Sequence, residues 1–522
     1  MKKTVAKFTV SQPRNTLLPD SVEHTLQLFE LGHYPEALQG CLAFVSSGDV
    51  RILLALKEIY QFGLAGQLDL DMAENYLSMA ARQDPESCFQ LAQWLEKGFN
   101  DDPDPVTAVQ YYMQAADMNH PKALLYLADC YSNGRLLMKD PEKAFDCILR
   151  AQMNAPGDKD AEYRLAMCFL NGDGTPANPT EALHYLSLAV RHKSVEAIYE
   201  LALMYSHGRG VTADRRKGFR LMNEAAAMNY APALFQLGLM YEEARGTTRN
   251  PERAFSWYHM AYELNYVPAF AKMAAFLIDG ESAGQDYRKA RSIAQRGAEL
   301  GNPECSYELF RIYMKGLGVK ADRETAMDHL NAAASGGSVA AMKTLGDIFL
   351  EDPAPDPAKA AEWYAKAADQ GNEDALLALA DMYSTDQWGM RDPARAKGYL
   401  GTLTEKFSSR RGYYRLGQLE ESGALGTPDP ERVRFCYTEA ARRGFNKAKF
   451  SLARLYHQGT LLEKDDRIAY YHAYGISSDF RDPEYAPLLK DIEHALTETE
   501  KNEIRQNVRM ETMSLASHKM QY

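Results

Sequence analysis

The sequence of 522 residues predicts an all-α fold, an α-solenoid of about twelve helix–loop–helix repeats of about 36 residues. Three observations support this fold class. A short leucine-containing pattern returns at a nearly constant interval, a second helical pattern follows each copy, and cap residues punctuate the chain in the same phase. Such repeat arrays grow without one closed core, so the length does not indicate several globular domains.

A short pattern returns along the chain: a leucine, then a small residue, then an aromatic residue four positions after the leucine. Leu127 with Tyr131 and Leu201 with Tyr205 are examples. We call the leucine the anchor and place the anchors at Leu56, Leu91, Leu127, Leu165, Leu201, Leu237, Met273, Leu309, Leu345, Leu379, Leu416 and Leu452. Successive anchors are 34 to 38 residues apart, and most are 36 apart. This regularity predicts the repeat and its first helix, helix A.

A second pattern, Ala-x-x-aromatic-x-x-x-Ala-Ala, follows each anchor by about seventeen residues, as in the stretch from Ala108 to Ala116. Its spacing of three and four places the small and aromatic residues on one helical face. It predicts the second helix of the repeat, helix B. The small residue after the anchor allows the two helices to approach closely. We therefore expect Gly238→Leu to cost about 1–3 kcal/mol through overpacking.

The ends of helix B carry recognisable cap residues. An Asp or Asn followed by proline predicts its first turn, because the side chain caps the helix and proline suits the first helical position. These pairs are Asp140-Pro141, Asn178-Pro179, Asn250-Pro251, Asp356-Pro357, Asp392-Pro393 and Asp429-Pro430. A glycine such as Gly371 or Gly444 is expected to end the helix.

The loop between the two helices reads Gly-x-Gly-Val-x-x-Asp in 208–214 and 316–322. With the Leu-Gly-x-x-Tyr run before it, this loop resembles the Sel-one-like repeat (SLR) family, a tetratricopeptide-like group, over roughly Leu53 to Gly475. The resemblance implies a right-handed superhelix with one concave groove, and a role as adaptor or scaffold. A minority of secreted bacterial members have been linked to β-lactam binding or hydrolysis. The loops 349–357 and 384–393 lack the glycines, so we expect them to differ in conformation.

The ends of the chain are expected to close the array. We divide the chain into an N-terminal tail with a degenerate capping helix pair (1–48), the repeat array (49–480) and C-terminal capping helices with a tail (481–522). Thr497 and Glu500 have the spacing of a capping box, which predicts a charged helix running to about Leu515. We expect residues 1–18 and 516–522 to be loosely ordered.

Composition limits the partners and the compartment. The net charge of −12 disfavours nucleic acid and anionic membranes as main partners. No apolar stretch is long enough to span a membrane, and the first residues are too polar for a secretory signal. Seven cysteines without CxxC spacing fit reduced thiols. We therefore expect a cytoplasmic, bacterial protein.

No catalytic, cofactor-binding or metal-ligating residues are predicted. The chain has no Walker loop, no HExxH and no GxSxG elbow, and its twelve histidines do not converge on a shared pattern. The function that we expect is a protein–protein interaction scaffold or adaptor that binds a protein or peptide in the concave groove. Two alternatives stay open: a β-lactam-binding or other hydrolase-type protein, and a bacterial effector that acts on host proteins.

Candidate partner-binding residues come from three sources. The aromatic residues two positions before the anchor could line the groove or only pack between helices. The residues two positions after the anchor should face the concave side, where they could recognise a partner or simply be solvated. The third source is a basic segment near the end of the array. Together these give Asp129, Tyr163, Met167, Tyr199, Phe235, Leu239, Tyr307, Arg311, Asp381, Arg410, Arg411, Tyr414, Arg415, Arg442, Arg443 and Arg454.

Charge reverses between neighbouring repeats. Residues 345–392 contain eleven acids and three bases, whereas residues 405–454 contain eleven bases and six acids. We hypothesise that the basic segment docks an acidic partner or another copy of the chain. The alternative is a solvated charged surface.

Overall fold

The computed structural model describes residues 19–66, 68–99, 102–280, 284–476 and 480–521. These residues form 28 α-helices and one short 3-10 helix, and no strand occurs among them. The predicted all-α solenoid is confirmed. The helices group into two compact units, Met1–Leu264 and Asn265–Tyr522. We describe each unit separately; the predicted three-part division at 48 and 480 stays a prediction.

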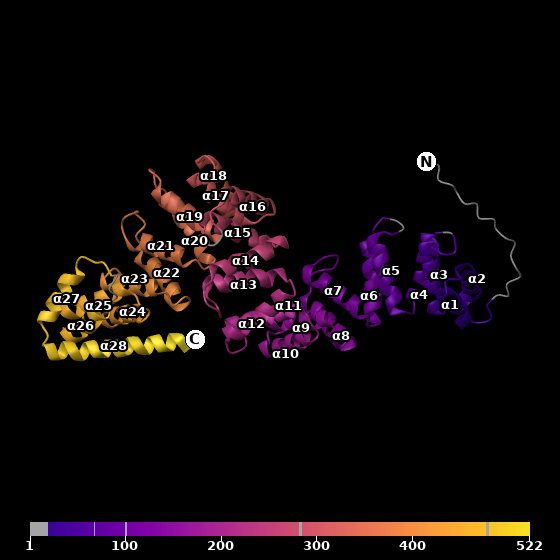
Figure 1. Cartoon of the computed structure of the whole chain (residues 1–522), viewed down its shortest axis with the longest axis horizontal. Helices are drawn as coiled ribbons and strands as arrows, with labels where there is room; N and C mark the ends of the chain where they lie inside the picture. The colour runs from indigo at the N-terminus through magenta and orange to yellow at the C-terminus, as the bar shows by residue number, and fades with distance from the viewer. Residues whose placement is uncertain (1–18, 67, 100–101, 281–283, 477–479, 522) are drawn as a thin grey trace. The chain divides into compact units, whose positions relative to one another are not determined.

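Unit 1 begins with a helix pair and continues with six repeats, in each of which helix A precedes helix B (Figure 1). Its helices are α1 (Val22–Glu30), α2 (Tyr34–Phe44), η1 (Val45–Ser47), α3 (Val50–Phe62), α4 (Leu70–Ala81), α5 (Pro85–Lys97), α6 (Pro105–Asp117), α7 (Pro121–Asn133), α8 (Pro141–Asn154), α9 (Lys159–Asn171), α10 (Pro179–Arg191), α11 (Val195–His207), α12 (Arg215–Ala227), α13 (Ala231–Glu243) and α14 (Pro251–Glu263).

Unit 2 contains six further repeats and two terminal helices. Its helices are α15 (Val267–Asp279), α16 (Tyr287–Glu299), α17 (Pro303–Lys315), α18 (Arg323–Ser335), α19 (Val339–Glu351), α20 (Pro357–Asp369), α21 (Glu373–Ser384), α22 (Pro393–Glu405), α23 (Arg410–Glu421), α24 (Pro430–Arg442), α25 (Asn446–Gln458), α26 (Asp466–Tyr474), α27 (Tyr485–His494) and α28 (Glu498–Gln521).

The core of each repeat lies between helix A and helix B. Every predicted anchor falls on a helix A, and all are buried except Leu416, which is partly buried. The small residue after the anchor allows an aromatic ring of helix B to lie against helix A. A Cβ added to Gly346 would come within 2.5 Å of the ring of Tyr364, and one added to Gly417 within 2.7 Å of Tyr437. The predicted close approach is therefore a helix A backbone in contact with a buried tyrosine.

A backbone hydrogen bond repeats at the junction of the two helices. The amide of the residue that caps helix B donates to the carbonyl of the aromatic residue at the end of helix A. Asp140 bonds to Tyr131 at 3.0 Å, and Asp392 bonds to Tyr383 at 2.8 Å. All six predicted Asp-Pro and Asn-Pro pairs begin a helix B, with the Asp or Asn side chain accepting from the first turn. The cap residues therefore fix both the start of helix B and its attachment to helix A.

The two glycines of the loop serve different contacts. Gly316 ends α17 in the left-handed conformation at φ +66°, where a side chain would be strained. Gly318 also has a positive φ, and an added Cβ would lie 2.8 Å from Tyr287 of the preceding repeat. The second glycine therefore allows adjacent repeats to pack closely. The loops that lack these glycines differ as expected, because α19 and α21 end in extended residues, Asp352 and Thr385.

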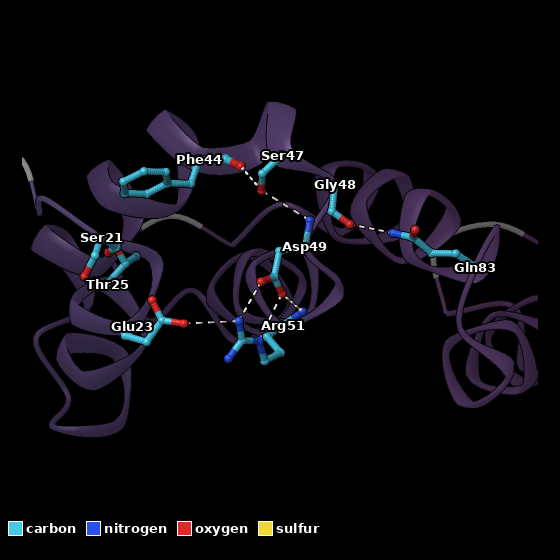
Figure 2. A network of polar contacts seen from close by, with 9 residues as sticks. All are labelled: Ser21, Glu23, Thr25, Phe44, Ser47, Gly48, Asp49, Arg51 and Gln83. Atoms are coloured by element: carbon cyan, nitrogen blue, oxygen red, sulfur yellow. Dashed lines mark hydrogen bonds and ion pairs between the residues drawn. The ribbon is translucent and has the colours of Figure 1, made fainter.

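Polar contacts join the first helices of unit 1. Figure 2 shows Asp49, which caps α3 and binds the Arg51 guanidinium at 2.7 Å. Arg51 also lies 3.5 Å from Glu23 of α1, and the Gln83 side chain donates to the Gly48 carbonyl. This network ties the initial helix pair to the first repeat.

At the other end of the chain, the predicted capping box is confirmed. The Thr497 amide donates to the Glu500 carboxylate at 3.0 Å, and the Glu500 amide donates to the Thr497 hydroxyl at 3.4 Å. The helix that follows, α28, continues to Gln521 rather than ending near Leu515. The tail predicted for 1–18 lies outside the described residues.

Candidate functional site

A cleft of unit 2 lies over the A helices α19, α21 and α23, and residues at the start of α25 also line it. It has a volume of about 580 Å³. Four of the predicted binding residues, Asp381, Arg411, Tyr414 and Arg415, line it together. The rest of its lining is Lys343, Asp347, Asp374, Leu377, Ala378, Gln418, Phe445 and Lys447.

The lining residues of this cleft occupy a few fixed positions relative to the anchor. On α23 the residues five, two and one before Leu416 and two after it are Arg411, Tyr414, Arg415 and Gln418. Each of these residues lies three or four positions from at least one other, so they form one face of the helix. We call it the inner face. The same positions on α21 supply Asp374, Leu377, Ala378 and Asp381, which places equivalent side chains of neighbouring repeats along one surface.

Within the cleft, the acidic and basic segments of the sequence meet each other. Arg411 pairs with Asp374 at 2.9 Å, and Arg415 pairs with Asp381 at 3.0 Å. Burial raises the pKa of the Asp381 carboxyl, although the Arg415 charge acts in the opposite direction. Part of the positive charge of the basic segment is thus neutralised by acidic residues of the same chain. Docking of an acidic partner, or of another copy, stays a prediction.

A smaller cleft of about 200 Å³ lies over α21 and the start of α23. Arg410 and Arg411 line it, together with Glu373, Asp374 and Leu377. Arg410 is exposed and makes no ion pair with any described residue. Unlike Arg411, which pairs with Asp374, Arg410 can therefore offer its charge to a partner at this surface.

The remaining predicted basic residues lie outside both clefts. Arg442 and Arg443, at the end of α24, pair with Glu439 at 2.9 Å and 2.5 Å. Arg454 of α25 pairs with Glu421 at 2.5 Å. The basic segment is therefore divided between the inner face and the end of a helix B.

Unit 1 has its own cleft of about 310 Å³, which lies over α7, α8 and α9. The predicted residues Asp129, Tyr163 and Met167 line it. Arg164, which the sequence prediction omitted, pairs with Asp129 at 2.5 Å. Burial raises the pKa of Tyr163 to about 12, so its hydroxyl stays protonated.

Three further predicted residues of unit 1 lie on α11 and α13 and are half-buried. Tyr199 packs edge-on against Tyr230, and Phe235 packs against Tyr258 of α14, with ring centroids 5.5 and 5.4 Å apart. Leu239 is half-buried two positions after its anchor. The rings thus contribute to packing, as one of the two interpretations of the aromatic pattern expects.

On α17, Tyr307 and Arg311 also have partners within the chain. The Tyr307 hydroxyl lies 3.2 Å from the Thr344 hydroxyl of α19. Arg311 pairs with Asp279 at 2.5 Å and with Glu308 at 2.8 Å. Burial raises the pKa of Glu308 to about 7, against the opposing effect of Arg311. Glu308 is buried in this charge cluster, Arg311 is partly buried and Asp279 is exposed, and none of the three lines a described cleft.

Sequence reasoning missed Arg164, Lys343 and Asp374 as cleft residues, whereas Lys447, which also lines a cleft, was included in the basic segment. The available signal was their position one, two or five residues before an anchor, on the same face as the predicted residues. That face becomes recognisable only when the helical spacing is followed upstream of the anchor as well as downstream.

The described cysteines share one environment. The seven cysteines are unpaired and buried. Burial raises the thiol pKa to about 11 at Cys41, Cys88, Cys147, Cys168 and Cys436 and to about 12 at Cys305. Among the described residues no group of three or more His, Cys, Asp or Glu could hold a metal ion. None of the helices described is both long and apolar enough to cross a membrane.

The fold and its clefts define a helical-repeat solenoid whose described clefts combine charged and apolar side chains. The Sel1 repeat model matches the chain twelve times, and the chain belongs to the Sel1 repeat family. The matched residues are 51–84, 85–120, 121–151, 159–194, 195–230, 231–266, 271–302, 303–338, 340–372, 373–401, 411–445 and 446–476. The resemblance drawn from the sequence is confirmed. Proteins of this family typically mediate protein–protein interaction and are generally not enzymes.

Sequence relatives share only part of their length with this chain. An uncharacterized protein of Neisseria meningitidis serogroup B, NMB1327, is 31% identical over 30% of this chain and 33% of its own length. Alginate biosynthesis protein AlgK of Pseudomonas syringae pv. tomato is 30% identical over 34% of this chain and 38% of its own. Chitin synthase regulatory factor 3 of Schizosaccharomyces pombe is 29% identical over 30% of this chain and 18% of its own. The chain spans well under half the length of each.

A solved structure with the same fold covers nearly the whole chain. It is c5321, a protective antigen present in uropathogenic Escherichia coli strains displaying an SLR fold, with a TM-score of 0.54 and 22% identity. The match covers 93% of this chain and 97% of that one. The likeness is one of fold.

Proposed function

We propose that this protein is a non-catalytic scaffold that binds protein or peptide partners along the inner faces of its A helices. The observation that carries the proposal is the convergence of Asp381, Arg411, Tyr414 and Arg415 in one cleft of about 580 Å³. Extended surfaces built from successive repeats are the usual binding device of solenoid proteins.

The inner face of helix A is less buried than the face that packs against helix B, although Tyr414 also packs against Tyr437, with ring centroids 5.7 Å apart. On α23, Gly417 packs against Tyr437 and Leu419 is buried, whereas Tyr414 is half-buried and Arg415 is exposed. Tyrosine and arginine are enriched among residues that dominate binding energy at protein interfaces. The paired acids hold the guanidinium groups in place, which favours specificity more than raw affinity.

The proposal places the protein in the cytoplasm, supported by seven buried cysteines that form no disulfide. The partner is a protein or peptide rather than nucleic acid or membrane, as the net charge of −12 favours. No specific observation favours the hydrolase-type function or delivery into a host cell.

Site-specific photo-crosslinking in cells that produce the protein tests the proposal. A benzophenone amino acid replaces Tyr414 in the cleft or, as a matched control, Phe435, which is 59% exposed on helix B of the same repeat. We expect adducts with a partner protein from position 414 and few or none from 435. Adducts from 435 without adducts from 414 would overturn the proposal.

A further inference from the structure

One combination of residues occurs in a cleft of each unit, at equivalent repeat positions. An Asp two residues after one anchor pairs with an Arg one residue before the next anchor, and a Tyr directly precedes that Arg. In unit 1 these residues are Asp129, Tyr163 and Arg164, with the ion pair at 2.5 Å. In unit 2 they are Asp381, Tyr414 and Arg415, with the pair at 3.0 Å.

The combination is absent from the other consecutive repeats of the sequence. The Asp at the first position recurs as Asp347, but Leu377 and Ala378 then stand where the Tyr and Arg would be. Tyr recurs as Tyr199 and Tyr307, but each is followed by a glutamate. Packing of the repeats therefore does not require the combination, and both copies line a cleft.

The two clefts also share their surroundings. Each has apolar side chains beside the ion pair, Ile148 and Met167 in unit 1 and Leu377 and Phe445 in unit 2. Each has one exposed lysine, Lys139 or Lys447, that makes no ion pair with any described residue. An apolar surface thus lies in the same cleft as cationic groups in both units.

We propose that these two clefts are duplicate binding sites for peptide segments that carry an acidic side chain next to an apolar one. This inference rests on the proposed function and names its partner class. The chain then has two binding sites for such segments, one in each unit.

Each cleft contains cationic side chains that can donate hydrogen bonds to an acidic group. An arginine presents five N–H donors, and the pairing Asp occupies only part of them. In unit 1 the side chains of Arg164 and Asp129 are 35% and 55% exposed, and in unit 2 those of Arg415 and Asp381 are each 45% exposed, so a second carboxylate has access. The unpaired lysine adds a further donor. Burial of the neighbouring apolar side chain supplies affinity through removal of its surface from water.

The two sites are not equal in strength. The unit 1 cleft also contains Asp173, so its two cations are matched by two acids. The unit 2 cleft has four cations and three acids and is larger. We therefore expect the acidic peptide to bind unit 2 more tightly.

The test uses the full chain and a library of fluorescein-labelled heptapeptides. Each peptide has a central Asp or Glu flanked by Leu, Ile, Phe or Tyr in a Gly/Ser background. Fluorescence polarisation selects the best binder, and calorimetry counts the peptides bound per chain.

The variants are R164A, R415A and the double variant. R395A is the control, because Arg395 is a 66% exposed arginine of helix B that also pairs with an Asp but lines no described cleft. Circular dichroism confirms that each variant is folded.

We expect two peptides per chain for the wild type and for R395A. R164A and R415A should each retain one strong site and weaken the other about tenfold or more, as loss of a charge-assisted hydrogen bond predicts. A stoichiometry of one, loss of all binding in a single variant, or no binding by any library peptide would overturn the duplicate-site proposal. Because the photo-crosslinking at Tyr414 does not depend on these peptides, a failure here is distinguishable from a failure of the scaffold function.

Discussion

The inner faces of two stretches of A helices differ in chemistry although the repeats are built alike. On α9, α11 and α13 of unit 1, the residues two positions after the anchors are apolar, whereas on α19, α21 and α23 of unit 2 they are polar. The first set is Met167, Leu203 and Leu239, and the second is Asp347, Asp381 and Gln418. The surface offered to a partner therefore changes along the chain.

The packing between helix A and helix B does not change in the same way. Gly238 of unit 1 lies against Tyr258, and Gly417 of unit 2 lies against Tyr437. Both tyrosines are fully buried, and each donates a hydrogen bond of 2.5 Å to a glutamate of its helix A. The residues of helix A that face helix B are constrained by packing. The residues of the inner face can vary from repeat to repeat and so can suit a partner. Three predictions test this division.

The largest effect is expected at the shared packing face. Gly238→Ala and Gly417→Ala should each destabilise the chain by about 1–3 kcal/mol, because the new methyl group overlaps a buried tyrosine ring. Urea unfolding followed by circular dichroism measures the loss. Gly401→Ala is the control, because a Cβ at Gly401 meets no atom within 4 Å. A large loss in one unit and none in the other would contradict a common packing face.

A smaller, pH-dependent effect is expected at Glu308, which is buried beside Arg311 and faces Asp279 and Glu304. Its pKa is about 7 in the folded chain, compared with the usual 4.5, so the folded state holds the proton more tightly. The stability that this proton brings is complete below pH 4.5 and is lost as the pH rises to about 7.

Glu308→Gln removes this dependence. The variant should be more stable than the wild type above pH 7, by on the order of 2 kcal/mol, and should show a flatter stability profile between pH 4.5 and 7. Thermal unfolding at a series of pH values measures it. A variant whose profile parallels that of the wild type would show that Glu308 is already ionised at pH 5.

The smallest effect is expected when the two kinds of inner face are exchanged. Leu239→Asp should cost about 1 kcal/mol, because it removes a half-buried apolar side chain. Asp381→Leu should change stability by less than about 1 kcal/mol, because its ion pair with Arg415 is nearly half exposed. Urea unfolding compares the two. A loss from Asp381→Leu as large as that from Gly417→Ala would show that the charged face holds the fold.

The sequence allowed the repeat to be predicted because its determinants are local and recur. Anchors such as Leu237, caps such as Asp140 and loop glycines such as Gly316 each act within one repeat. The clefts were predictable only in part. Asp381 and Arg415 were both named, but their pairing depends on how successive A helices pack, across 34 residues of chain. The basic segment was therefore expected to face a partner, whereas part of it faces the acidic residues of the preceding repeat.

The central claim is that the inner face of unit 2 binds the partner. Affinity capture with quantitative mass spectrometry tests it, with the wild type, R411E/R415E and the matched reversal R395E/R434E as baits. Arg395 and Arg434 lie on B helices, are at least half exposed and line no described cleft. The account predicts that R411E/R415E loses partners that R395E/R434E keeps. Equal retention by both folded variants, or equal loss, would contradict it.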